Sequence, residues 1–188
     1  MQLITYNTQQ ILEPSVITVG SFDGVHLGHQ ALFKQMNHYA KMNNCKSAVI
    51  TFNPHPQEVL QNKPDFFLIN SFEQVLNLFE KFGIELTYVI PFSADFSRKT
   101  ATQFFEEDIF SKINVKAVFL GPNHHFGRQR EGNAETLQKI CEKRKIEVFV
   151  AQKYKVNNTE VSSTLIRKYL KEKDFQNAER MMGHMLIN

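Results

Sequence analysis

Two histidines three residues apart follow the first apolar segment of the chain. Residues 20–29 read Gly-Ser-Phe-Asp-Gly-Val-His-Leu-Gly-His. Glycines let backbone amides approach a ligand closely, and a helix N-terminus offers free N–H groups to an anion. His26 and His29 fall on one side of the predicted first helical turn, so both imidazoles can reach one phosphate. The stretch lacks the patterns of a P-loop and of a dinucleotide fold, which excludes those two solutions.

The two histidines have two alternative interpretations. In the first, they are helix-cap residues, and Gly28 merely allows the helix to pack on a sheet. In the second, they bind zinc, but a zinc site needs a third ligand that the motif does not supply. Cys45 and Cys141 lie far apart without C-x-x-C spacing, so they indicate neither zinc nor a disulfide and favour a reducing cytoplasm. The position after a strand favours phosphate binding.

The elements that position this loop alternate along the chain. Short apolar runs predict buried strands at residues 16–20, 47–52, 87–91, 115–120 and 146–151. Helical patterns occupy residues 27–43, 71–82, 102–111, 133–144, 163–171 and 174–182. Ser71 and Gln74 form a predicted capping box, and Gly83 ends that helix. This order predicts an α/β, Rossmann-like parallel sheet with helices on both faces and ligands at the carboxyl ends of the strands.

Composition narrows the class of partner. A chain of 188 residues predicts one domain, and 42% hydrophobic with 22% charged residues is ordinary for a water-soluble protein. The net charge of +3 is too weak for a nucleic-acid binder, so phosphorylated small molecules fit better. Residues 1–12 show no export signal, and no run of eighteen apolar residues occurs, so no membrane contact and a cytoplasmic location are expected. The sequence defines no oligomeric state.

Four motifs together resemble a known family. The stretch at residues 20–30 is similar to the H-x-G-H signature of the nucleotidylyltransferase superfamily, and most closely to the FAD synthetase (FMN adenylyltransferase) module of bacterial bifunctional riboflavin kinase/FAD synthetases. Residues 51–56 resemble T-F-x-P-H-P, residues 121–132 resemble G-x-[DN]-x-x-F-G-x-x-R-x-G, and residues 161–167 resemble S-S-T-x-I-R. The resemblance covers residues 16–183. It implies transfer of AMP from ATP to FMN, which yields FAD and pyrophosphate.

The resemblance assigns roles toward ATP. His26, His29 and Arg167 are the predicted catalytic residues; they donate to phosphate oxygens and stabilise the leaving pyrophosphate. The predicted ATP-binding residues are Gly20, Ser21, Phe22, Asp23, Gly24, Gly28, Gly121, Ser162, Ser163 and Thr164. A plain helix N-cap is the alternative for the serines, and Asp23 orients either a ribose or a histidine. Mg²⁺ is expected on the ATP phosphates, with no protein ligands assigned because no carboxylate cluster marks a metal site.

The same resemblance assigns the flavin site. The predicted flavin-binding residues are Phe52, Asn53, Pro54, His55, Pro56, Asn123, Phe126 and Arg128. The sequence does not decide whether the last three contact the flavin, its phosphate or ATP. His124 and His125 replace residues that are more often aromatic and basic in the family loop. The acidic residues 106–108 are interpreted as a solvated surface.

Two further expectations follow from the length of the resemblance. The chain stops where the bifunctional proteins continue into a riboflavin kinase barrel, so residues 1–188 are expected to form one FMN adenylyltransferase domain without riboflavin kinase. The alternatives are another nucleotidylyltransferase, acting on nicotinamide mononucleotide, phosphopantetheine or a cytidylyl acceptor, and a catalytically silent flavin- or nucleotide-binding regulator. RNA binding rests on the small net charge alone, and no K-M-S-K-S-like string supports an aminoacyl-tRNA synthetase.

Overall fold

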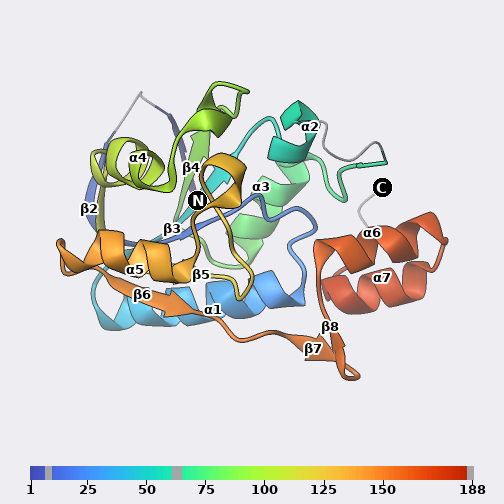
Figure 1. Cartoon of the computed structure of the whole chain (residues 1–188). Helices are drawn as coiled ribbons and strands as arrows, with labels where there is room; N and C mark the ends of the chain where they lie inside the picture. The colour runs from blue at the N-terminus through green and yellow to red at the C-terminus, as the bar shows by residue number, and fades with distance from the viewer. Residues whose placement is uncertain (7–9, 61–64, 186–188) are drawn as a thin grey trace.

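A six-stranded sheet forms the centre of the computed structural model, which describes residues 1–6, 10–60 and 65–185 (Figure 1). Its strand order is β1-β4-β3-β2-β5-β6, and every neighbouring pair is parallel. The strands are β1 (Gln2–Thr5), β2 (Ile11–Val19), β3 (Lys46–Phe52), β4 (Leu86–Ile90), β5 (Ile113–Leu120) and β6 (Glu147–Val150). The predicted parallel α/β fold is therefore confirmed.

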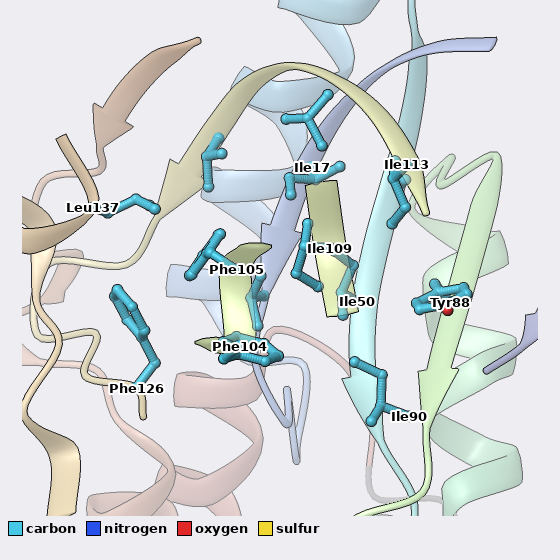
Figure 2. Close-up of a cluster of buried hydrophobic side chains, with 14 of the residues drawn as sticks. Ile17, Ile50, Tyr88, Ile90, Phe104, Phe105, Ile109, Ile113, Phe126 and Leu137 are labelled. Carbon is cyan, nitrogen blue, oxygen red and sulfur yellow. The ribbon is translucent and has the colours of Figure 1, made fainter. Parts of the chain in front are cut away.

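Side chains alternate between the two faces of the sheet, and each face has its own core. Val16 and Val49 point to one face with Phe33 and Phe79, which come from α1 (Leu27–Met42) and α3 (Phe72–Lys81). On the other face lie α5 (Ala134–Glu142) and a continuous helical segment formed by α4 (Ala101–Gln103) and η2 (Phe104–Phe110). Figure 2 shows Phe104, Phe105 and Phe126 gathered in this second core. Helices on both faces leave the strand ends as the place for a ligand.

The predicted start and end of α3 are both found in the structure. The Ser71 side chain accepts from the Gln74 amide, and the Gln74 side chain accepts from the Ser71 amide, so the capping box is confirmed. Gly83, with φ of +76°, follows the helix end as expected. The predicted helix at residues 102–111 is instead mostly π-helical: the Ser111 amide donates to the Glu106 carbonyl, five residues back.

The acidic segment within this π-helix is not uniformly solvated, which corrects the sequence interpretation. Asp108 is almost fully buried. Its carboxylate accepts hydrogen bonds from Lys99 Nζ at 2.7 and 2.8 Å and from the Tyr6 hydroxyl. Burial and the hydrogen bond to Asp108 raise the pKa of Tyr6 to about 12. Charge pairing therefore lets this carboxylate remain inside the fold.

A smaller third cluster holds the C-terminal helices beside the sheet. It joins α6 (Ser163–Lys171) and α7 (Phe175–Met182), which Figure 1 shows packed side by side. The hairpin of β7 (Lys155–Val156) and β8 (Thr159–Glu160) leads into α6. Gln30 Nε2 donates to the Met182 carbonyl at 2.6 Å and so ties this unit to α1. The remaining short helices are α2 (Pro56–Leu60), η1 (Phe96–Arg98) and η3 (Arg128–Arg130).

The chain reverses its direction of winding between β2 and β5. From β2 it passes through α1 to β3 and on to β4, and then crosses to β5 on the opposite side of β2. Such a switch point opens a crevice at the carboxyl ends of the two strands. The loops after β2 and β5 carry the first and third sequence motifs. Among the described residues, no helix is long and apolar enough to cross a membrane.

The second core predicts a large effect of truncating Phe105, which is fully buried. We expect Phe105→Ala to lower the free energy of unfolding by about 3–5 kcal/mol, because a large cavity replaces the ring. Phe175→Ala is the matched control: that ring is 52% exposed, so a change of at most about 0.5 kcal/mol is expected. Urea denaturation measures both values, and equal losses in the two variants would contradict this assignment of the core.

Candidate active site

Two adjoining cavities open at the carboxyl edge of the sheet. The first, of about 400 Å³, is lined by His26 and His29 and is called the histidine cavity. The second, of about 710 Å³, is lined by Phe52, Phe92, Phe96, Phe104 and Phe126 and is called the phenylalanine cavity. The residues that line both define the junction: Val19, Gly20, Ser21, His55, Gln57, Asn123, His124 and Arg130.

The two histidines form a stacked pair at the start of α1. His26 is the N-cap, and its Nδ1 accepts the His29 amide at 3.3 Å. The ring centroids are 3.6 Å apart with an interplanar angle of 16°. A methyl group added at Gly28 would lie 3.2 Å from the His26 ring, so only glycine leaves room for this stacking without a shift. Gly28 thus serves the histidine pair directly.

Burial favours the neutral form of both imidazoles. Burial lowers the pKa of His26 from 6.5 to about 4, and burial together with the neighbouring His26 lowers that of His29 well below its usual value. Because Nδ1 of His26 accepts a backbone hydrogen, its proton is assigned to Nε2, which can donate to a ligand. His29 packs edge-on against Phe22, with 5.0 Å between ring centroids. The pair therefore offers two fixed, uncharged donors.

Asp23 is anchored by two backbone amides and an arginine. Its buried carboxylate accepts the amides of Ile69 at 3.0 Å and Asn70 at 3.1 Å and pairs with Arg167. Arg167 Nε also donates to the Phe67 carbonyl at 2.8 Å, and the guanidinium lies 4.5 Å from the Phe66 ring centroid. Asp23 thus forms an internal clamp with Arg167, and its predicted role toward a ribose or a histidine stays a prediction. Arg167 still lines the histidine cavity while held by these contacts.

The motif before α6 combines a cap with a loop contact. Ser162 is the N-cap, and its hydroxyl accepts the Leu165 amide at 3.2 Å. Ser163 donates its hydroxyl to the Asp23 carbonyl at 2.8 Å. Both serines line the histidine cavity, so the helix N-terminus faces it. Thr164 lies outside both cavities because it is on the exposed side of α6.

Of the other predicted ATP-binding residues, most line the histidine cavity and one lies outside it. Those that line the histidine cavity are Gly20, Ser21, Phe22, Asp23, Gly28 and Gly121. Phe22 lies mostly within the α1–α3 core, which fixes the His29 ring from behind. Gly24 lies outside both cavities, at a φ of +84°, where a methyl group would meet Ile69 at 3.0 Å, so its role toward ATP stays a prediction. It shapes the turn rather than the cavity wall.

Six of the eight predicted flavin residues line the phenylalanine cavity, namely Phe52, His55, Pro56, Asn123, Phe126 and Arg128. Asn53 and Pro54 do not, because they lie exposed at the end of β3. His55 Nδ1 accepts the Gln57 amide at 3.0 Å, and its ring stacks on Phe66. Burial lowers the pKa of His55. This leaves its Nε2 as a donor at the junction.

The loop after β5 is held in place by glycines. A methyl group at Gly127 would lie 2.6 Å from the Ala101 amide nitrogen, and one at Gly132 would lie 2.6 Å from Phe126. Phe126 and Gly132 pair through two backbone hydrogen bonds of 2.9 and 3.1 Å. The close approach to α4 fixes Phe126 as the shared wall of core and cavity.

Several cavity residues were not predicted from the sequence. The sequence assigned no site role to Gln57, Phe66, Phe92, Phe96, Lys99, Phe104, Arg130 or Tyr154. Arg130 had a signal, since it is the arginine of the third motif. The phenylalanines had none, because a residue that lines a cavity and one that fills a core have the same hydrophobic pattern.

Three buried polar atoms without a hydrogen-bond partner belong to residues that line these cavities. In the described part of the chain, His29 Nδ1, Gln57 Oε1 and His124 Nε2 are buried without a hydrogen-bond partner. All three residues line the histidine cavity, and two lie at the junction. Buried polar groups are normally satisfied, so these three atoms are positions where a polar ligand or ordered water can bind. No group of three or more described His, Cys, Asp or Glu side chains is arranged to hold a metal ion.

A parallel sheet with a histidine pair after β2 defines an α/β fold of the nucleotidyltransferase type. A model of the FAD synthetase family matches residues 8–165, and the chain belongs to this family.

Similar proteins agree with this placement. Proteins described as bifunctional riboflavin kinase/FMN adenylyltransferase are 31% identical over 179 residues in Buchnera aphidicola and 32% identical over 170 residues in Listeria monocytogenes. They cover 95% and 90% of this chain, which spans 57% and 54% of their lengths. A solved structure described as a macrolide-efflux protein from Streptococcus pneumoniae has a TM-score of 0.87 at 28% identity, over 99% of this chain and 61% of that one.

The depressed pKa of His26 predicts an acid-sensitive fold. The unfolded chain binds more protons than the folded one between pH 6.5 and about 4, so the free energy of unfolding falls as the pH falls through this window. We expect His26→Gln to make that slope shallower by up to about 1.4 kcal/mol per pH unit. Urea denaturation at several pH values measures it. His38→Gln, at an exposed position on α1, is the control, and an unchanged slope in His26→Gln would contradict the prediction.

Proposed function

We propose that this chain transfers AMP from ATP to FMN, which forms FAD and releases pyrophosphate. The observation that carries the proposal is the junction of two cavities of different chemistry. The histidine cavity presents imidazole donors and the N-terminus of α6, which suit a polyphosphate. The phenylalanine cavity offers aromatic walls, which suit a flat ring system. Family membership and the names of the relatives support the same assignment.

The chemistry requires alignment rather than a strong base. An oxygen of the FMN phosphate attacks the α-phosphorus of ATP, and the bond from that phosphorus to the bridging oxygen of pyrophosphate breaks. The attacking oxygen is already an oxyanion near neutral pH, so no proton has to be removed from it. Catalysis then consists of holding the two phosphates in line and of stabilising the charge that develops.

The histidine pair supplies donors in this scheme. Neutral imidazoles donate through N–H groups whose directions are fixed by stacking and by the N-cap bond. A polyphosphate beside them favours the protonated form, so binding draws their pKa values upward.

The N-terminus of α6 and Arg167 face the same cavity. The backbone N–H groups of Ser163 and Thr164, at the start of α6, and the helix dipole favour the β- and γ-phosphates. Arg167 acts on pyrophosphate from its place against Asp23, which holds the guanidinium within the cavity wall. Magnesium enters the proposal as part of the ATP complex, and residues 1–188 act as one FMN adenylyltransferase domain.

Two other functions are separated by simple outcomes. Another nucleotidylyltransferase would consume ATP with nicotinamide mononucleotide, phosphopantetheine or a cytidylyl acceptor and would ignore FMN. A silent flavin-binding regulator would bind FMN without turnover. The phenylalanine cavity favours a flavin acceptor over smaller ones, and the intact histidine pair favours turnover over silence.

The acceptor assignment predicts a defined product pattern. The purified chain, incubated with ATP and Mg²⁺, is expected to form FAD from FMN and neither FMN nor FAD from riboflavin. Chromatographic separation of the flavins measures this. FMN that remains unchanged while ATP is consumed with another acceptor would contradict the assignment.

The donor role predicts a large kinetic effect at His29. We expect His29→Ala to lower the turnover of FAD formation by roughly a hundredfold or more, the scale of losing one preorganised donor. His38→Ala, exposed on the same helix, is expected to retain wild-type turnover. Steady-state rates at saturating ATP and FMN compare the two, and a near-normal rate in His29→Ala would remove the assigned role.

A further inference from the structure

His124 lies at the junction with its ring held in place. It lines both cavities, on the loop between β5 and α5. Its amide donates to the Gly121 carbonyl at 3.2 Å, and its ring packs nearly parallel to Phe126, with 5.8 Å between centroids. Because Phe126 is itself buried in the second core, the imidazole has a firm support.

The Nε2 atom of His124 lacks a hydrogen-bond partner among the described residues, although it is buried. Such an atom requires an explanation, because a buried polar group without a partner is unfavourable. The ring occupies the boundary between an aromatic cavity and a phosphate-binding one. A ligand that spans both cavities would place its polar linking group at this boundary.

The surroundings of His124 are cationic. Arg130 also lines the junction, and no carboxylate of the described residues forms an ion pair with it. His125 and Arg130 are close enough to add to the effect of burial, which lowers the pKa of His124 to about 4. His55 offers an Nε2 donor from the opposite loop. The carboxylate of Glu160, which lines the histidine cavity, accepts hydrogen bonds from Lys153 and Asn123.

We propose that His124 Nε2 donates a hydrogen bond to the phosphate monoester of the acceptor and so selects phosphorylated over unphosphorylated flavin. This assignment rests on the proposed adenylyl transfer, which requires the acceptor phosphate to reach the histidine cavity from the phenylalanine cavity. His124 is a positioning and specificity residue in this scheme. Arg130 supplies positive charge beside it, and Phe126 fixes the plane of the ring.

Equilibrium binding of FMN and riboflavin tests the assignment without catalysis. Flavin fluorescence gives the dissociation constants for wild type, His124→Phe and His124→Gln. Phe keeps a flat ring against Phe126 and removes the donor, whereas Gln keeps a donor. We expect His124→Phe to weaken FMN binding by roughly tenfold to a hundredfold, as for losing a hydrogen bond to a charged group, with riboflavin binding unchanged. His124→Gln should restore part of the preference for FMN.

A control and a measurement on the unaltered protein complete the test. His38→Phe changes an exposed histidine on α1 that lines neither cavity, and it should keep the preference for FMN. In ¹⁵N-labelled wild-type protein, the His124 Nε2 resonance should move on addition of FMN and stay unchanged with riboflavin. This result does not depend on whether a variant folds.

The assignment is overturned if His124→Phe weakens the binding of FMN and of riboflavin equally, or if the wild type binds both flavins equally. It is also overturned if the Nε2 resonance does not shift when FMN is added. Its failure is separate from that of the proposed function. If the wild-type chain forms FAD and His124→Phe keeps the preference for FMN, only the role of His124 is contradicted. If the wild-type chain forms no FAD and His124→Phe loses the preference for FMN, the transfer reaction is contradicted and the phosphate contact is supported.

Discussion

The buried carboxylate of Asp23 joins three parts of the chain that are far apart in sequence. It accepts amides from Ile69 and Asn70 and pairs with Arg167, while its own carbonyl accepts from Ser163. Breaking such a buried pair by removing one partner typically costs about 3–5 kcal/mol, because the other charge remains unpaired. The loop after β2, the segment before α3 and the start of α6 are therefore held in one arrangement. The position of the histidine pair relative to the α6 N-terminus depends on it.

Around that clamp, burial disfavours a charge on the imidazoles of the site. Burial holds His26 and His124 in the neutral form, and His29 and His124 each retain a buried nitrogen without a partner in the described part of the chain. Preorganised donors of this kind need little rearrangement when negative charge develops beside them. The aromatic walls of the neighbouring cavity come from the same phenylalanines that cover one face of the sheet. Core packing and ligand shape are thus specified together.

Periodicity was sufficient for most of the fold. Five strands and the main helices follow from apolar alternation and helix-end residues, whereas β1 was missed because its four residues bury only Ile4. The π-helical hydrogen bonding of η2 and the burial of Asp108 depend on Lys99 and Tyr6, which no local pattern connects. The motifs located the histidines and the α6 serines at one cavity. They did not reveal that Asp23 and Arg167, 144 residues apart, bind each other, nor that Gly24 and Thr164 lie outside both cavities.

A structure with a non-hydrolysable ATP analogue and FMN bound together tests most directly the claim that the two cavities divide the substrates. The account predicts the triphosphate against His26, His29 and the N-terminus of α6, with the flavin ring between the phenylalanines. It also predicts an FMN phosphate oxygen about 3–3.5 Å from the α-phosphorus, in line with the leaving pyrophosphate. A flavin ring in the histidine cavity, or an FMN phosphate directed away from the junction, would contradict it.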